Sequence, residues 1–502
     1  RVTRRGGGSG QLAPPPFLSY HSCTMQFTRI AKALPASLAA LGAALIAFLL
    51  LGGEGARAGS LAKRVAGTDM AGKTREQVAV AIEKASTLTV CDGVPAAVEG
   101  AWPCFRGAKL DGIGTERAPL AREWGPEGPP VLWTIDVGEG YAGAAVLNGR
   151  VYLIDYDREA QADVVRCLSL ADGRDIWRFS YPVPVKRNHG MSRTVPAVTP
   201  AYVVTLGPKC HVVCLNAETG AFVWAIDLVR AWKAKVPQWY AGQCPLIDRD
   251  RVILAPGGDA LLIAVELATG KVLWQSPNPG RWQMTHATPM PMELRGTRMY
   301  VYPGSGGVAG IAAEDGALLW QTDAWKISIA TVPSPVIAGG GRVFLTGGYN
   351  AGAMMLKIDA QDGAFAARTL YTLDPKVFAS IQQTPILYQE RLFAVKYDGQ
   401  LACADLDGRV LWTSGSGNTF GLGPYALAQG LLYVVNDKGR LTLVDAGAGE
   451  YRRLAEFEVL QGHDAWGPLA IAGGRLIMRD FTRMVCLDIR DRAARAAQGG
   501  VQ

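Results

Sequence analysis

The sequence predicts an all-β protein, an eight-bladed β-propeller of four-stranded blades whose last blade is closed by an N-terminal strand. Three observations predict it: a repeat of one blade's length, four short apolar runs within the repeat, and an unpaired run ahead of the first copy. A closed ring hides the strand edges that an open sheet would expose, and it can absorb a chain of 502 residues as one repeat architecture.

The repeat is marked by a two-residue turn ending in glycine, followed four residues later by tryptophan. Successive turn glycines lie 41 to 50 residues apart, which is typical of propeller blades. Asp362-Gly363 and Ala448-Gly449 are degenerate copies without the tryptophan. A large flat side chain at a fixed site of each blade predicts packing between neighbouring sheets. Five copies carry it: Trp177, Trp224, Trp274, Trp320 and Trp412.

Four strands can be placed in one repeat, because turn residues separate four alternating runs. In the second copy these runs are Ala197–Thr199, Tyr202–Leu206, His211–Asn216 and Phe222–Ile226. The last copy, from 468 to 489, has only three runs. Val131–Ile135 stands alone before the first copy and contains a tryptophan, so it is expected to supply the missing strand.

The chain ahead of the repeats predicts export. After Met25 come two basic residues, an uncharged stretch from 33 to 53, and the small-x-small pattern Ala56-Arg57-Ala58. A cleaved signal peptide and an uncleaved anchor in the inner membrane both fit, and either places the protein in the periplasm or another extracytoplasmic space. The expected divisions are 1–24, a non-native or disordered leader; 25–58, signal peptide or anchor; 59–100, a spacer with a helix from Arg75 to Ala85; 101–490, the propeller; and 491–502, a disordered tail.

The charge distribution argues against a nucleic-acid partner. Of the 51 basic and 44 acidic residues, six and one lie in residues 1–58, so the remainder has a net charge near +2. A chain that binds DNA or RNA is expected to carry a strong basic patch.

The cysteines divide into two groups. Cys167, Cys214, Cys403 and Cys486 share one position of the repeat and are expected to be buried as small hydrophobic side chains. Cys91 and Cys104 flank a Gly/Pro-rich stretch outside the repeats. They are the disulfide candidates, and both the bridge and the free thiols stay open.

The loops between blades are the expected functional surface. Each stands just before an innermost strand, so all eight should meet at the mouth of the central channel. Three of the histidines, His189, His286 and His463, occupy equivalent loop positions. They indicate a polar pocket, with bracing of the ring as the alternative. They come from loops a quarter-turn or a half-turn apart, so no metal site is assigned.

An organic ligand spanning the mouth would need aromatic rings to stack on, cations to pair with carboxylates, and amides to orient it. His463 and Asp464 are the candidate acid–base pair, with a loop-bracing turn as the alternative. The candidate ligand-binding residues are His189, Arg193, Trp239, Tyr240, Gln243, His286, Asn350, Gln382, Gln383, Lys396, Phe420, Trp466 and Arg479.

The repeat resembles that of the PQQ-repeat propellers, with Cys214-Leu215-Asn216-Ala217-Glu218-Thr219-Gly220 as its cleanest copy. The stretch from Trp102 to Gly112 is similar to the entry segment of PQQ-binding-like propellers. That family includes quinoprotein alcohol dehydrogenases and BamB-like assembly lipoproteins. The resemblance implies the propeller fold, and for the dehydrogenases a pyrroloquinoline quinone (PQQ) cofactor beside two adjacent cysteines, with a calcium ion and an aspartate base. No adjacent cysteine pair is present, so the resemblance leaves the cofactor unknown, with PQQ as one option.

Two functions follow. The first is an exported propeller that binds a small anionic or quinone-like ligand at the mouth, with oxidoreductase activity of the quinoprotein type left open. The alternative is a non-enzymatic, BamB-like scaffold that holds a protein partner on the same face. Contact with the membrane would come from the N-terminal segment if it is not cleaved.

Overall fold

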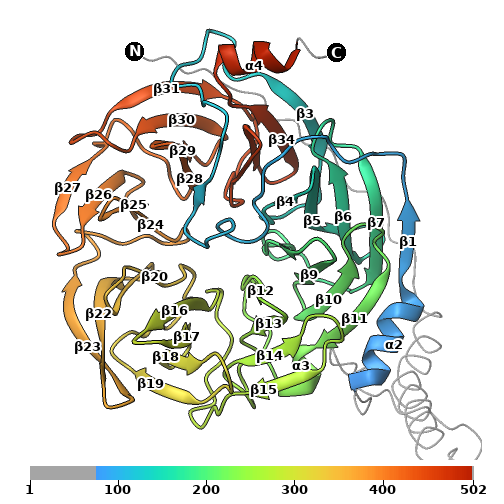
Figure 1. Cartoon of the computed structure of the whole chain (residues 1–502), viewed down its shortest axis with the longest axis vertical. Helices are drawn as coiled ribbons and strands as arrows, with labels where there is room; N and C mark the ends of the chain where they lie inside the picture. Colours follow the sequence, from blue (N-terminus) through green and yellow to red (C-terminus); the bar gives the residue numbers. More distant parts are fainter. Residues whose placement is uncertain (1–74, 500–502) are drawn as a thin grey trace, which may run out of the picture. The chain divides into compact units, whose positions relative to one another are not determined.

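The computed structural model describes residues 75–499, whose strands form eight sheets that follow one another around a ring (Figure 1). This confirms the eight-bladed propeller. The middle strands of each blade are buried nearly throughout, because neighbouring blades cover both faces of a sheet. They therefore appear in the sequence as short continuous apolar runs. The predicted leader and signal or anchor segment lie outside the described residues. No helix in residues 75–499 is long and apolar enough to cross a membrane.

The first four blades each contain four antiparallel strands in chain order from the centre outward, and β1 is added outside β7. Their strands are β1 (Thr87–Val90), β4 (Ala145–Leu147), β5 (Arg150–Asp157), β6 (Ala162–Ser169) and β7 (Asp175–Pro182); β8 (Ala197–Val198), β9 (Tyr202–Leu206), β10 (His211–Asn216) and β11 (Phe222–Asp227); β12 (Leu246–Asp248), β13 (Arg251–Leu254), β14 (Ile263–Glu266) and β15 (Val272–Gln275); and β16 (Met290–Leu294), β17 (Thr297–Gly304), β18 (Gly307–Ala312) and β19 (Leu318–Thr322).

The last four blades follow the same plan, with two strands contributed by the chain ahead of the repeats. Their strands are β20 (Val336–Ile337), β21 (Arg342–Gly347), β22 (Gly352–Gln361) and β23 (Ala364–Leu373); β24 (Ile386–Tyr388), β25 (Arg391–Val395), β26 (Leu401–Asp405) and β27 (Val410–Thr413); β2 (Ile113–Gly114), β28 (Tyr425–Ala428), β29 (Leu431–Val435), β30 (Arg440–Asp445) and β31 (Arg453–Glu458); and β3 (Val131–Asp136), β32 (Ala470–Ala472), β33 (Arg475–Arg479) and β34 (Arg483–Asp488).

The ring closes through β3. This strand pairs antiparallel with β34, with Thr134 opposite Val485, and so forms the outer strand of the sheet β32–β34. Trp133 on β3 is buried like the tryptophans of the other blades. The two ends of the propeller chain therefore share one blade.

The tryptophans pack between blades, as predicted. The rings of four of them lie against the turn glycine of the next blade: Trp133, Trp177, Trp224 and Trp274. A Cβ on Gly270 would come within 2.7 Å of the Trp224 ring. Several indole N–H groups also donate to a carbonyl of the next blade, as Trp224 does to Leu267 at 2.8 Å and Trp133 to Leu170 at 3.1 Å. Trp133, Trp224 and Trp274 thus each supply both apolar burial and a directional contact to the next blade.

Blade 5 makes this contact with a different residue. The hairpin of β22 and β23 runs four residues further than the repeat predicts, and Tyr371 reaches the next blade. Its hydroxyl donates to the Leu406 carbonyl at 3.1 Å, and its ring lies against Gly408. The tryptophan is missing from this copy because a tyrosine further along the strand takes its place.

The segment from Ala101 to Gly114 crosses the centre of the ring and forms a plug (Figure 1). Trp102 pairs with β4 of blade 1, and the Pro103 carbonyl accepts from Val198 of blade 2. Arg106 donates to the carbonyls of Thr384 and Pro385 just before β24, and β2 pairs in parallel with β28. Blades on opposite sides of the ring are therefore joined through this one segment.

The cysteine at each repeat position is fully buried, as predicted. Cys91 and Cys104 are free, so the alternative with a disulfide is not realised. The Cys91 backbone N–H pairs with Ile176 on β7, whereas Cys104 belongs to the plug, where its thiol donates to the Gly107 carbonyl. The two residues are thus held by different parts of the ring.

Within residues 75–499, three helices accompany the blades: α2 (Arg75–Ala85), α3 (Leu228–Trp232) and α4 (Arg492–Gly499). α2 has the bounds expected from the sequence and packs on β7 and β11 through Val78 and Ile82. The tail from 491, expected to be disordered, contains α4 in the part that the structure describes. Asp491 accepts from the Ala494 N–H at the start of this alanine-rich segment, which is a favourable helix cap.

Candidate functional site

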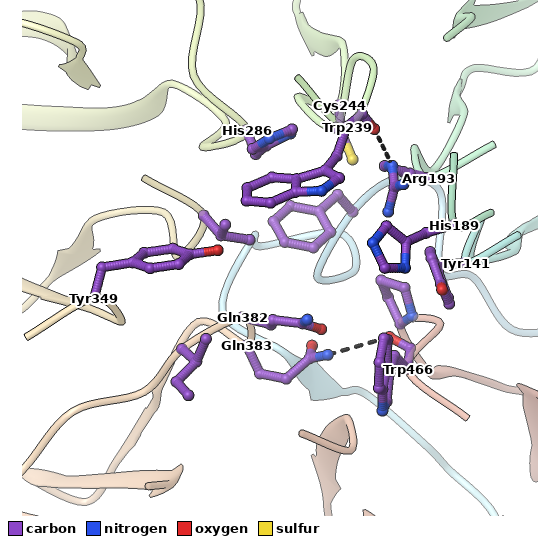
Figure 2. A pocket seen from close by; sticks show the side chains of 15 residues that line it. Tyr141, His189, Arg193, Trp239, Cys244, His286, Tyr349, Gln382, Gln383 and Trp466 are labelled. Carbon is purple, nitrogen blue, oxygen red and sulfur yellow. Dashed lines mark hydrogen bonds between the residues drawn. The ribbon is translucent and has the colours of Figure 1, made fainter. Parts of the chain in front are cut away.

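A cavity of about 310 Å³ lies where the inter-blade loops meet. Figure 2 shows its side chains converging from several blades on a common space. The plug contributes Phe105 to the lining. The lining residues are Phe105, Tyr141, His189, Arg193, Trp239, Gly242, Cys244, His286, Val332, Tyr349, Ile381, Gln382, Gln383, Trp466 and Pro468.

Five aromatic residues contribute rings to the wall: Phe105, Tyr141, Trp239, Tyr349 and Trp466. Tyr141 and Trp466 stack with ring centroids 5.3 Å apart, and Trp239 and Tyr349 lie nearly parallel at 6.4 Å. Gln383 donates from its amide to the Trp466 carbonyl at 3.1 Å and thereby joins blade 6 to blade 8. The wall is therefore preformed by contacts between loops of different blades.

Arg193 is the permanent charge in the lining. Its guanidinium lies 5.0 Å from the centre of the Tyr141 ring and donates to the carbonyls of Trp239, Asn188 and Gly190. Burial lowers the pKa of Arg193 to about 10, partly offset by the Tyr141 and Tyr240 hydroxyls. The side chain therefore stays charged at neutral pH, and no carboxylate is present among the residues that line the cavity.

Two of the three loop histidines line the cavity. His189 has a left-handed backbone conformation with φ of 54°. Burial, with a smaller effect from nearby Arg193, lowers the pKa of His286 to about 4, so His286 is neutral at pH 7. A Cβ on Gly242 would lie 2.6 Å from its Nδ1 atom, so glycine allows the ring to approach the next loop.

His463 lies outside the lining, on an exposed loop. Its Nδ1 atom is 3.4 Å from Asp464 Oδ2, and its ring stacks on Phe481 with centroids 5.2 Å apart. The expected acid–base pair is thus formed but does not line the cavity. The residues described here contain no group of three or more His, Cys, Asp or Glu side chains that could hold a metal ion.

Comparison with known proteins identifies the family. A family model described as outer membrane protein assembly factor BamB matches residues 160–407, 230–453 and 398–494, which together span most of the propeller. The chain belongs to this BamB-like family of PQQ-repeat propellers. The sequence is 24% identical over 335 residues to the BamB of Moranella endobia, covering 64% of this chain and 70% of that protein.

Two further relatives of this PQQ-repeat propeller carry the same name. The BamB of Shewanella oneidensis is 22% identical over 339 residues, covering 64% of this chain and 69% of that protein. The crystal structure of BamB from Moraxella catarrhalis aligns with a TM-score of 0.49 and 13% identity, covering 72% of this chain and 99% of that one.

Seven of the expected ligand-binding residues line the cavity: His189, Arg193, Trp239, His286, Gln382, Gln383 and Trp466. The others lie elsewhere, and several of them brace the loops. Gln243 is fully buried. Its amide nitrogen donates to the Ala255 carbonyl, and its amide oxygen accepts from the Ala255 N–H. Arg479 is buried and donates to the carbonyls of Gly138 and Phe481 at 2.8 Å. These side chains are used within the propeller because buried polar groups need partners there.

The remaining four expected residues also lie outside the lining. Lys396 pairs with Asp398 at 3.1 Å, and Phe420 is buried in the core between blades 6 and 7. The Tyr240 hydroxyl donates to the Lys186 carbonyl, and Asn350 is exposed in the turn between β21 and β22. Position in a loop near the mouth did not reveal the direction of these side chains.

The sequence also missed parts of the lining. Tyr141 stands in an inter-blade loop and could have been chosen on that signal, as could Cys244 beside Gln243. Tyr349 comes from the loop between β21 and β22, which opens on the same face. Phe105 reaches the cavity through the plug, and nothing in the repeat pattern indicates this.

The lining does not fit PQQ, the cofactor of the dehydrogenases that share the repeat. PQQ carries three carboxylates, whereas Arg193 is the one permanently charged side chain that lines the cavity. The lining also lacks a carboxylate to hold a calcium ion, and it has one cysteine, Cys244, where an adjacent pair would be needed. We therefore derive no redox step for this site.

Proposed function

We propose that this propeller is a non-enzymatic scaffold in the periplasm or at the membrane, which holds a protein partner on the face formed by its inter-blade loops. Membership of the BamB-like family supports a scaffold more than an enzyme. The mouth cavity belongs to the same face. The observation that carries the proposal is an exposed apolar rim beside the cavity.

The rim consists of Ile329, Tyr349, Val377 and Tyr397, which are 55%, 44%, 43% and 46% exposed. Each stands in a loop that opens on the mouth face: between β19 and β20, β21 and β22, β23 and β24, and β25 and β26. Apolar side chains gathered on one face are typical of protein interaction sites.

The proposal predicts that charge on the rim releases the partner. Val377→Asp with Tyr397→Asp should lower the amount of partner that co-purifies with the tagged full-length chain by about tenfold or more, because each substitution puts a carboxylate into an apolar contact. Quantitative mass spectrometry of material purified from the cell envelope measures this.

The matched control is Leu273→Asp with Leu411→Asp. These leucines are 44% and 46% exposed, but they lie on the outer strands β15 and β27, away from the mouth face. The control should leave the partner bound. Equal loss from both pairs of substitutions would show that the rim is not the binding surface.

A second candidate function is the binding of a small anionic or quinone-like ligand in the cavity. The observation that favours it is Arg193, a charged side chain facing a cavity whose lining contains no carboxylate. Mass spectrometry of small molecules released from the purified full chain tests it. A stoichiometric anion lost in an Arg193→Gln variant would support this function.

A further inference from the structure

The cavity has an unusual balance of charge. The polar side chains of its lining include one arginine, two histidines, two glutamines and two tyrosines, and His286 is neutral at pH 7. Carboxylates are absent from the lining, so Arg193 is its one permanently charged group. A ligand that enters is therefore favoured if it is anionic.

Arg193 is held in place before any ligand binds. Its Nε and Nη2 atoms donate to three loop carbonyls, while the described residues provide no hydrogen-bond acceptor for Nη1. The Tyr141 ring lies below the guanidinium. A fixed planar cation with a free donor, partly removed from water, is suited to a carboxylate oxygen.

The rest of the cavity is suited to an aromatic ring. Trp239, Tyr349 and Trp466 lie around the same space as Arg193, and Gln382 points its amide into it (Figure 2). Phe105 also lines the cavity. Ring faces and edges of this kind favour stacked or tilted aromatic contacts. A volume of about 310 Å³ is near the lower end of the range of about 300 to 1,000 Å³ found for ligand pockets. The space is therefore small for an extended cofactor.

Tyr349 belongs to both the cavity lining and the rim. It is 44% exposed on the mouth face, and the other rim residues from this side of the ring, Val377 and Tyr397, stand in loops of blades 5 and 6 that open on the same face. A ligand whose anionic aromatic end fills the cavity can thus extend along apolar side chains outside it. A polypeptide that ends in an aromatic residue has this form.

We infer that the cavity binds the C-terminal aromatic residue of the partner protein, with its α-carboxylate on Arg193 and its side chain among the aromatic rings. The preceding residues lie along the rim. This inference rests on the proposed scaffold function and names the part of the partner that enters the mouth. It also accounts for a rigid, charged cavity on a face that otherwise offers apolar contacts.

The test compares two peptides of the same apolar sequence that end in phenylalanine, one with a free carboxylate and one with a C-terminal amide. Titration into the full-length chain, followed by calorimetry, should show the free acid binding about 10- to 100-fold more tightly, because the amide loses a charge-assisted hydrogen bond. Equal affinity for acid and amide, or binding of neither peptide, would overturn the inference. N-acetylphenylalanine is the third arm. If this small acid binds and neither peptide does, the assignment to a polypeptide is overturned.

Arg193→Gln should lower the affinity for the free acid to that for the amide. The control is Arg409→Gln, which changes an exposed arginine beside the turn between β26 and β27 and should leave both affinities unchanged. If Arg193→Gln does not fold, the acid–amide comparison in the unmodified protein still decides the question, and Gln382→Ala provides a milder variant. Loss of the partner on rim substitution together with equal affinity for acid and amide would retain the scaffold and reject the C-terminal site. The converse result, with acid-selective binding but no effect of the rim, would reject the scaffold as proposed.

Discussion

Trp224→Ala is expected to lower the free energy of unfolding by about 3 to 5 kcal/mol, the range for removal of a buried large aromatic side chain. The indole is 5% exposed, lies against Gly270 of the next blade and donates to the Leu267 carbonyl. The substitution therefore leaves a cavity between two blades and a carbonyl without its donor. Equilibrium unfolding in urea, followed by circular dichroism, measures the change.

Trp239→Ala is the control for this prediction. Trp239 stands at the mouth and stacks on Tyr349, so its removal empties part of the site without separating two sheets. It should change stability by about 1 kcal/mol or less. A similar loss of stability from both substitutions would contradict the role assigned to the repeat tryptophan.

Asp163→Asn is expected to stabilise the protein at neutral pH. Asp163 on β6 is fully buried, and neither of its carboxyl oxygens makes a hydrogen bond of good geometry with the described residues. Tyr181 faces it on β7, and Gly207 of blade 2 leaves room for it. Burial raises the pKa of Asp163 to about 8, with a smaller opposing effect from the Tyr181 hydroxyl.

The direction of the pH dependence follows from that raised pKa. Between about pH 4 and pH 8 the folded state keeps a proton that the unfolded state releases, so stability falls as pH rises through this window. The loss by pH 7 is on the order of 4 kcal/mol. Asparagine does not titrate, so the variant should lack this decline. Melting temperatures of both proteins at pH 4, 5.5 and 7 measure the effect.

Asp248→Asn should behave in the opposite way. Burial raises the pKa of Asp248, but hydrogen bonds from Arg298 and Tyr300 lower it more, so the net shift is downward. Its ionised form contributes stability that is present at neutral pH and lost as pH falls through the folded-state pKa. The variant should therefore be less stable at pH 7. A melting temperature for Asp163→Asn that falls between pH 4 and 7 as in the unmodified protein would contradict the account of Asp163.

The ring could be predicted because its signals are local and periodic. A turn glycine followed by tryptophan recurs at the length of one blade, and the unpaired run at Val131–Ile135 matches the three-stranded last copy. Blade 5 shows the limit of this approach, since Tyr371 replaces the tryptophan only because its hairpin is longer. The plug left no periodic signal, because its backbone bonds to three different blades and its Arg106 side chain to a fourth.

The candidate site was predicted in part, because loop position and side-chain direction are separate properties. The pattern correctly placed His189, Arg193 and His286 at the mouth, where their loops converge. It also selected Gln243 and Arg479, which turn inward to satisfy buried backbone groups. Direction depends on contacts between blades that are distant in sequence.

The central claim is that the partner binds the face formed by the inter-blade loops, and site-specific photo-crosslinking in growing cells tests it most directly. A photoreactive residue would replace Ile329 or Tyr397 on the rim, or Leu411 on the outer strand β27. We expect a discrete crosslinked protein from both rim positions and none from Leu411, with loss of the rim product in the Arg193→Gln background. Crosslinking from Leu411 with none from the rim would contradict the account.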